Sequence, residues 1–278
     1  MADARAIASA VSEAIGVAAT SLRPDVLASM RAAAEVEPSA RGRSVLAQLI
    51  KNAEIAETDH VPLCQDTGTV WVRVEIGVEE HLGELLQPVI DAAVREAYRA
   101  HALRMSVVRD GLFDRTNTGD NTPAFIELVT RPGIGATVHV MLKGGGSDNS
   151  SALTMLDPSA GIEGVKEFVL RTVVEKATGA CPPLVVGVGV GSTFDKVAGL
   201  AKRALLVPLG SDSPGETGVL ERELLDLVNG TGIGPAGLGG RTTALGVKVL
   251  TAPCHIAALP VAVNMGCSAV RTATVEVV

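Results

Sequence analysis

Three cysteines stand in three separate, motif-like segments of the sequence. Cys64 lies in Pro-Leu-Cys-Gln-Asp-Thr-Gly, Cys181 in Gly-Ala-Cys-Pro-Pro, and Cys267 in Asn-Met-Gly-Cys-Ser-Ala-Val-Arg. Each segment has the small, polar or glycine-containing composition of a loop that binds a small anionic ligand. Three thiolates could also hold a four-iron cluster and leave one iron without a protein ligand, where it would act as a Lewis acid.

The spacing of the cysteines does not by itself establish such a cluster. Neighbouring cysteines from Cys64 through Cys181 and Cys254 to Cys267 are separated by 117, 73 and 13 positions, so the sequence contains no ferredoxin-type run. His255 lies 12 positions before Cys267, which fits no local zinc-finger spacing. A lone histidine with apolar neighbours is typical of a structural residue, and Cys64 could equally be a small buried apolar residue in a turn.

The other polar segments allow both binding and structural interpretations. Beside Cys64, Gln65 could donate hydrogen bonds and Asp66 could act as a base, orient one, or cap a turn. Residues 117–123, Asn-Thr-Gly-Asp-Asn-Thr-Pro, form either an anion-holding loop or an ordinary turn, and their composition favours the turn. Residues 143–149, Lys-Gly-Gly-Gly-Ser-Asp-Asn, lack the P-loop spacing, but their amides could converge on an anion.

A third glycine-rich segment, Gly-Val-Gly-Val-Gly at 187–191, lies within a predicted strand. It lacks the spacing of a dinucleotide-binding fingerprint. We therefore predict that its glycines permit close packing of a helix against the sheet.

The composition limits the partners and the compartment. A net charge of -7 argues against a nucleic-acid or anionic-membrane surface. Apolar stretches are shorter than the ~20 residues needed to span a bilayer. Charged residues interrupt the first 22 positions, so no signal peptide is expected. Four cysteines are too few for a disulfide scaffold, and we expect a cytosolic protein with reduced thiols.

Hydrophobic periodicity predicts a mixed α and β (α+β) protein. Residues 1–57 should form an N-terminal helical part, and a mixed-sheet unit should follow it. Helices are expected at 4–20, from Pro24 onward, and at 41–56, 82–103, 162–178, 194–206 and 217–229. Strands are expected at 70–76, 124–129, 136–142, 184–190, 243–250, 256–263 and 272–278. The strands at 124–129 and 136–142 should pair around Pro132-Gly133. We expect one domain over residues 1–278, with two lobes as an alternative and a short linker at 210–218.

Taken together, the ordered segments closely resemble the α subunit, or N-terminal half, of class I iron–sulfur-dependent fumarate hydratases. The wider family includes L(+)-tartrate dehydratase. The resemblance extends from about residue 60 to the end of the sequence. The matching segments are CQDTG at 64–68, LRMS at 103–106, NTGDNTPA at 117–124, KGGGSDN at 143–149, ACPP with VGVGVG at 180–191, and HIAALPVAVNMGCSAVR at 255–271.

The resemblance implies a cofactor and a set of site residues. Cys64, Cys181 and Cys267 would hold a 4Fe–4S cluster, whereas Cys254 falls outside the ligand positions. The implied catalytic residues are Asp66, Gln65, Arg104 and His255, and the implied substrate-binding residues are these four with Lys143, Gly145 and Gly146. The family's remaining substrate-binding residues belong to a C-terminal domain or β subunit, so we expect this chain to need a β subunit and to form an oligomer.

The implied reaction is the reversible hydration of a C=C bond flanked by carboxylates. It needs a Lewis acid for the hydroxyl group, fixed donors for the developing negative charge, and a base for the C3 proton. Arg104 and the loop amides suit the second role, and Asp66 could orient or assist the base. Fumarate/malate is the first expected substrate pair, L(+)-tartrate the second, and mesaconate/citramalate a third. A non-catalytic module that binds an anion or nucleotide through the glycine loops is an alternative of a different class.

Overall fold

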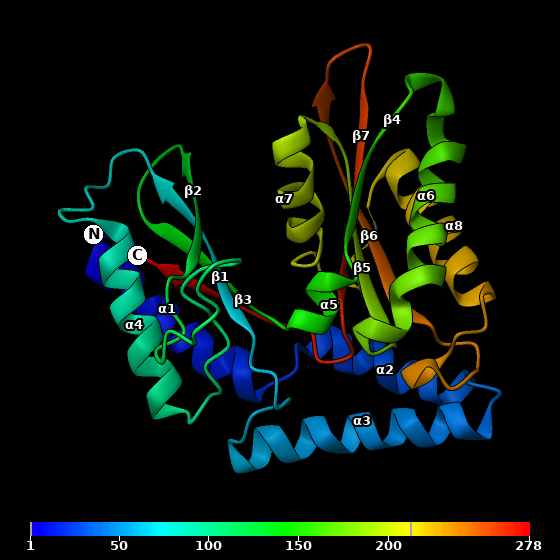
Figure 1. The fold of residues 1–278 in the computed structure, drawn as a ribbon, viewed down its shortest axis with the longest axis horizontal. Helices are drawn as coiled ribbons and strands as arrows, with labels where there is room; N and C mark the ends of the chain where they lie inside the picture. Colours follow the sequence, from blue (N-terminus) through cyan, green and yellow to red (C-terminus); the bar gives the residue numbers. More distant parts are fainter. Residues whose placement is uncertain (1, 212) are drawn as a thin grey trace. The chain divides into compact units, whose positions relative to one another are not determined.

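The computed structural model describes residues 2–211 and 213–278, which divide into two compact units (Figure 1). Unit 1 comprises the chain up to Arg23 together with Asn52–Gly145 and Arg271–Val278. Unit 2 comprises Pro24–Lys51 and Gly146–Val270. Each unit contains a four-stranded sheet and helices, which confirms the predicted α+β class.

Unit 1 is a sheet with strand order β2-β1-β3-β8. Helices α1 and α4 cover one of its faces (Figure 1). The strands are β1 (Thr69–Gly77), β2 (Phe125–Arg131), β3 (Ala136–Lys143) and β8 (Arg271–Val277), and the helices are α1 (Ala4–Thr20) and α4 (Leu86–Ala100). Alternate apolar residues of β1, such as Val70 and Val72, join Ile7 and Val11 of α1 in one buried core.

The predicted pairing of the second and third strands is wrong. Strand β1 lies between them, parallel to β2 and antiparallel to β3. The burial of the strands explains this order. Strand β1 is buried along most of its length, whereas β2 has exposed positions such as Phe125 and Leu128. A strand buried on both faces takes a central place, and this outweighs the tendency of consecutive strands to pair.

Unit 2 is a second sheet with strand order β4-β7-β5-β6. Helix α7 lies on one face, and α6 and α8 lie on the other (Figure 1). The strands are β4 (Ala152–Leu156), β5 (Leu184–Ser192), β6 (Ala244–Cys254) and β7 (Leu259–Gly266). The helices are α6 (Gly161–Lys176), α7 (Phe194–Ala204) and α8 (Gly215–Gly230). Helix α2 (Pro24–Val36) and the part of α3 (Ala40–Asp59) up to Lys51 also belong to this unit.

The glycines of β5 have the packing role that the sequence predicted. A Cβ atom on Gly187 would lie 2.3 Å from the carbonyl oxygen of Ala201, and one on Gly189 would lie 2.6 Å from that of Val197. Both oxygens belong to α7, so the helix can approach the strand only where side chains are absent.

Several other boundaries differ from the prediction. The short strand β4 and the short helix α5 (Gly145–Asn149) were not foreseen. Strand β7 begins at Leu259 and not at residue 256, because Ile256 lies in an exposed turn. Helix α8 begins at Gly215, inside the predicted linker. Within the described part of the chain, no helix is long and apolar enough to cross a membrane.

A buried carboxylate holds the turn between α2 and α3 in unit 2. Glu37 is 2% exposed and accepts hydrogen bonds from the amides of Ser39, Arg241 and Thr242 and from the Thr242 hydroxyl. Burial raises the pKa of Glu37, but these hydrogen bonds outweigh it and lower the pKa below its ordinary value of 4.5. Glu37 therefore contributes stability in its ionised form.

Replacing Glu37 with glutamine should destabilise unit 2. The change replaces one acceptor oxygen with an NH2 donor group that faces buried amides, and it removes the negative charge. The free energy of unfolding should therefore fall by about 2–3 kcal/mol at neutral pH. Because the folded pKa is lowered, the contribution is present above about pH 4.5 and is lost as the pH falls through the folded pKa.

Urea unfolding from pH 3 to pH 7 measures this effect. Glu35 is exposed, so Glu35→Gln makes the same charge change at the surface and provides the matched control. A difference between wild type and Glu37→Gln that does not shrink at low pH would contradict the assignment.

Candidate functional site

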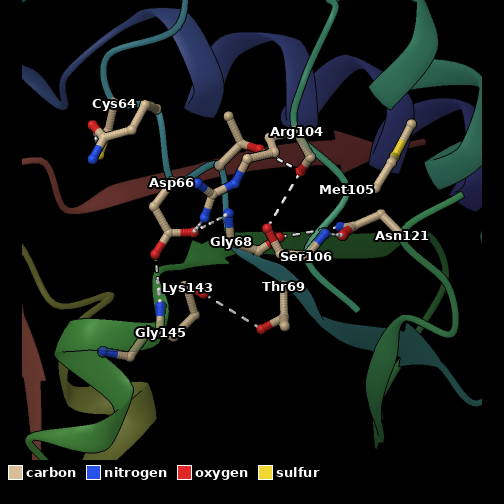
Figure 2. Close-up of polar contacts among 12 residues, drawn as sticks. Cys64, Asp66, Gly68, Thr69, Arg104, Met105, Ser106, Asn121, Lys143 and Gly145 are labelled. Carbon is tan, nitrogen blue, oxygen red and sulfur yellow. Dashed lines mark hydrogen bonds and ion pairs between the residues drawn. The ribbon is translucent and has the colours of Figure 1, made fainter. Parts of the chain in front are cut away.

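The side chain of Asp66 is at the centre of a polar cluster in unit 1 (Figure 2). Its Oδ2 accepts a hydrogen bond of 2.9 Å from the amide of Gly145, and its Oδ1 accepts one of 3.2 Å from the amide of Gly68. Arg104 Nη2 lies 3.5 Å from Oδ1. The structure therefore brings together three predicted site residues, Asp66, Arg104 and Gly145.

Buried polar groups hold the loop at residues 64–68 by its backbone. The hydroxyl of Tyr98, which is fully buried on α4, lies 3.0 Å from each of the carbonyl oxygens of Thr67 and Gly68. Burial raises the pKa of Tyr98, so its hydroxyl stays protonated and can donate. Asn121 donates to the Gly68 carbonyl at 3.1 Å and accepts from the Ser106 amide at 2.7 Å.

Arg104 combines an anchored backbone with an accessible side chain. Its carbonyl accepts a 2.8 Å hydrogen bond from the hydroxyl of Thr67. Its side chain is 60% exposed, whereas that of Asp66 is 27% exposed. The guanidinium is therefore open to a ligand beside a partly buried carboxylate.

Two glycines allow the loop to approach the end of β3. Gly68 has φ +77°, and a Cβ atom there would lie 2.4 Å from the Lys143 carbonyl oxygen. A Cβ atom on Gly144 would lie 3.1 Å from Asp66 Oδ2. Lys143, a predicted substrate residue, is 4% exposed at the last position of β3. Lys143 is thus buried, whereas Arg104 is exposed.

Residues 64 and 65 continue the same loop on its more exposed side. Cys64 is half-buried, and Gln65 is exposed. The Cys64 Sγ lies 3.5 Å from Gln65 Oε1. Both side chains are thus carried by the segment that positions Asp66.

Unit 2 contains the other two predicted cysteine ligands. The amide of Ser268, the residue after Cys267, donates to the Cys181 carbonyl at 3.1 Å, so the two cysteine-containing segments lie side by side. Gly146 packs against the segment before Cys181, where an added Cβ would lie 2.7 Å from the Gly179 carbonyl oxygen. Cys181 is exposed and Cys267 is half-buried.

Cys254 and His255 lie at the end of β6 and in the turn that follows it, also in unit 2. Both residues are exposed. The thiol of Cys254 lies 3.2 Å from the Ala258 carbonyl oxygen, and Nδ1 of His255 accepts a 3.1 Å hydrogen bond from the Ala257 amide. His255 Nε2 thus remains on the exposed side of a turn whose backbone orients the ring.

The segment at 117–123 is a turn, as its composition predicted. Asn117 accepts from the Gly119 amide at 2.8 Å, and Asp120 accepts from the Thr122 amide at 3.1 Å. Burial raises the pKa of Asp120, but hydrogen bonds from Thr122 and Arg95 outweigh it and lower the pKa to about 2. Asp120 is therefore an ionised structural residue at neutral pH.

The comparison with known proteins decides the family. A family model described as fumarate hydratase (Fumerase) matches residues 8–276. The chain belongs to the fumarate hydratase family. This confirms the resemblance seen in the cysteine and glycine segments.

Similar proteins in this family include several with tartrate dehydratase names. "Putative L(+)-tartrate dehydratase subunit alpha" of Methanocaldococcus jannaschii is 40% identical over 274 residues, covering 96% of each chain. The L(+)-tartrate dehydratase subunit alpha of Escherichia coli K12 is 35% identical over 263 residues, covering 93% of this chain and 86% of its own. The subunit of the same name from Shigella boydii shows the same identity and coverage.

Sequence reasoning overlooked three residues that hold the loop: Tyr98, Asn121 and Arg271. Tyr98 is the only tyrosine of the sequence and stands on an apolar helix face, where a buried hydroxyl needs a partner. Asn121 was noticed only as part of a turn, and Arg271 only as the end of a motif. Among residues 2–211 and 213–278, the structure does not itself gather three His, Cys, Asp or Glu side chains into a metal-binding group.

Replacing Asn121 with alanine should loosen this loop. Asn121 is fully buried with φ +59°, a conformation that asparagine tolerates better than alanine. The change removes the oxygen that accepts the hydrogen bond of the Ser106 amide, and we expect a loss of about 2 kcal/mol in the free energy of unfolding.

The control is Asn117→Ala, which changes an exposed asparagine of the same segment and should cost only about 0.5 kcal/mol. The midpoints of urea unfolding measure both values. Equal losses in the two variants would show that the buried contacts of Asn121 are not what stabilises the loop.

Proposed function

We propose that this chain is the α-type subunit of an iron–sulfur-dependent hydro-lyase that acts on a small dicarboxylate. Family membership supports the reaction class. The observation that supports a site in unit 1 is the cluster of Asp66, Arg104 and Gly145, in which a carboxylate, an exposed guanidinium and a backbone amide converge. This combination can bind one substrate carboxylate and place a proton-handling group beside it.

In this proposal each group of unit 1 has a defined task. Arg104 forms a bidentate pair with one substrate carboxylate and stabilises the charge that develops on it. Lys143 and Gly145 line the same carboxylate site, where the Gly145 amide holds Asp66. Gln65 donates a hydrogen bond to the substrate, and Asp66 orients or assists the base for the C3 proton. The family resemblance assigns His255 a substrate-side role as well.

Cys64, Cys181 and Cys267 are the proposed ligands of a 4Fe–4S cluster. Soft thiolate ligands suit iron–sulfur clusters, and none of these thiols is in a disulfide. All three lie in loops with partial or full exposure, and the segments of Cys181 and Cys267 are directly hydrogen-bonded. When bound, the cluster would supply a Lewis-acidic iron for the hydroxyl group. A reducing compartment such as the cytosol is part of this proposal, because the ligands must remain thiolates.

A second subunit belongs to the same proposal. The similar proteins carry the name subunit alpha, and this chain covers 86–96% of their lengths. A dicarboxylate needs a second set of cationic donors for its other carboxylate. We assign these donors, and the base itself, to a β subunit.

The substrate remains a choice between close chemical relatives. The names of the similar proteins favour L(+)-tartrate. The loops at 117–123 and 143–149 instead resemble those of fumarate hydratases, which favours fumarate and malate. Our first candidate is L(+)-tartrate because its support extends over almost the whole chain, and fumarate/malate is the second.

Anaerobic co-expression with the neighbouring open reading frame, followed by assays with L(+)-tartrate, malate and fumarate, tests the function. We expect turnover and a broad brown absorption from the two-subunit preparation, and almost no turnover from this chain alone. Robust turnover by the single chain would refute the need for a partner. A colourless, inactive complex that still binds anions would favour a non-catalytic binding module.

Iron content tests the ligand assignment. Cys64→Ser, Cys181→Ser and Cys267→Ser should each remove most of the iron, because each replaces a thiolate ligand with a weakly binding hydroxyl group. Cys254→Ser is the matched control and should retain nearly all of it. Iron per chain and visible absorption are measured after anaerobic reconstitution. Iron loss from Cys254→Ser as large as that from the other three would contradict the assignment.

Arg104→Lys tests the proposed carboxylate contact. Lysine keeps the charge but loses the planar fork, so kcat/KM should fall by an amount equivalent to about 2–5 kcal/mol. Stability should change little, because the side chain is 60% exposed and its pair with Asp66 is 3.5 Å long. The control Arg109→Lys alters an equally exposed arginine that pairs with Asp114 at 3.9 Å. Unchanged kinetics in a folded Arg104→Lys enzyme would assign Arg104 a structural role.

A further inference from the structure

Arg271, the first residue of β8, makes a contact that the proposed chemistry does not use. Its side chain is 2% exposed, and its Nη1 donates a hydrogen bond to the backbone carbonyl of Asp66. Its Nε is also buried and has no hydrogen-bond partner among the described residues. The acceptor that the structure shows for this guanidinium is therefore the backbone of Asp66.

The guanidinium of Arg271 also lies close to the side chain of Asp66. An ideal Cβ on Gly144 would lie 3.4 Å from Arg271 Nη2 and 3.1 Å from Asp66 Oδ2, so both groups border the same small space. The positive charge of Arg271 lowers the pKa of the buried Tyr98 hydroxyl and the negative charge of Asp66 raises it, so all three side chains lie within electrostatic reach of one another. A side chain at position 144 would crowd both groups.

Burying a guanidinium is unfavourable unless the group gains strong contacts. Among the described residues, the structure shows no carboxylate ion-paired with Arg271. The contact that it makes instead controls the position of a single residue, Asp66. It also connects the segment just after Cys267 to the segment just after Cys64, since Arg271 and Asp66 follow these cysteines by four and two positions.

We infer that Arg271 is a positioning residue for Asp66, an inference that rests on the proposed function of the site. Its guanidinium holds the Asp66 backbone from one side, while the Tyr98 hydroxyl holds the next two carbonyls of the loop. This keeps the Asp66 carboxylate in the position where it accepts hydrogen bonds from the amides of Gly68 and Gly145. Arg271 does not touch substrate and acts only through Asp66.

The test compares Arg271→Met with Arg271→Lys in the full chain and in the two-subunit enzyme. Methionine has a similar length but no donor, and lysine restores a cation that can donate to the Asp66 carbonyl. The control is Arg73→Met, which changes another buried arginine of unit 1. Arg73 forms ion pairs with Glu75 and Glu127, and among the described residues it makes no hydrogen bond or ion pair with residues 64–68.

The first measurement is amide hydrogen exchange, which does not depend on activity. In Arg271→Met the amides of Gly68 and Gly145 should exchange roughly tenfold faster, because their shared acceptor is no longer held in place. Arg271→Lys should recover part of this protection, and Arg73→Met should leave it unchanged. Unchanged exchange at both amides in Arg271→Met would overturn the inference. If Arg271→Met does not fold, Arg271→Lys decides: faster exchange supports the inference, and unchanged exchange overturns it.

The second measurement is the division of the effect between kcat and KM in the two-subunit enzyme. Misplacing Asp66 should lower kcat on the order of 10²-fold and leave KM within about threefold, since Arg104 still binds the carboxylate. A parallel change in Arg73→Met would assign Arg271 a merely structural role and overturn the inference. If wild type has no hydro-lyase activity, the proposed function fails, whereas the exchange experiment still decides the role of Arg271.

Discussion

The arrangement of unit 1 depends on one constraint: the carboxylate of Asp66 accepts hydrogen bonds from two backbone amides that are far apart in the chain. Gly68 and Gly145 can both reach it only if the loop at 64–68 lies directly against the end of β3. That approach excludes a side chain at Gly68 and leaves little room for one at Gly144. Because β3 is paired to β1, which begins right after the loop, the sheet itself sets the distance between the two segments.

A second constraint follows from the close approach. The carbonyls of Asp66, Thr67 and Gly68 do not pair within the sheet, and buried carbonyls without partners would be costly. Side chains from distant elements satisfy them, namely Arg271, Tyr98 and Asn121. In unit 2 the carboxylate of Glu37 likewise accepts hydrogen bonds from several backbone amides. The difference is exposure, because Glu37 is 2% exposed whereas the side chain of Asp66 is 27% exposed beside an open arginine.

The sequence predicted much of this structure wherever the signal is local. The helix at 4–20, the buried strand after residue 184 and the packing role of Gly187 and Gly189 follow from periodicity and composition. The insertion of β1 between β2 and β3 was missed, because strand order depends on burial of both faces of a strand and not on the turn between two segments. At the site, the motif residues Asp66, Arg104 and Gly145 were identified from the resemblance. The residues that orient them were not, because a hydrogen bond from Arg271 to a carbonyl 205 positions away leaves no local pattern.

The charge balance around Asp66 explains why a second subunit belongs to the proposed enzyme. The chain has a net charge of -7, so its overall field repels a dicarboxylate, and Asp66 adds a negative charge at the point of binding. Arg104 can offset one carboxylate, and Arg271 is committed to the backbone of Asp66. A dianion bound next to Asp66 therefore needs further positive charge. In the proposed enzyme cationic side chains of a β subunit would supply this charge, and the cluster held by Cys64, Cys181 and Cys267 would supply a Lewis-acidic iron for the hydroxyl group. In such an enzyme a substrate would be bound tightly only when all the components are assembled, and this would confine proton removal to the complete enzyme.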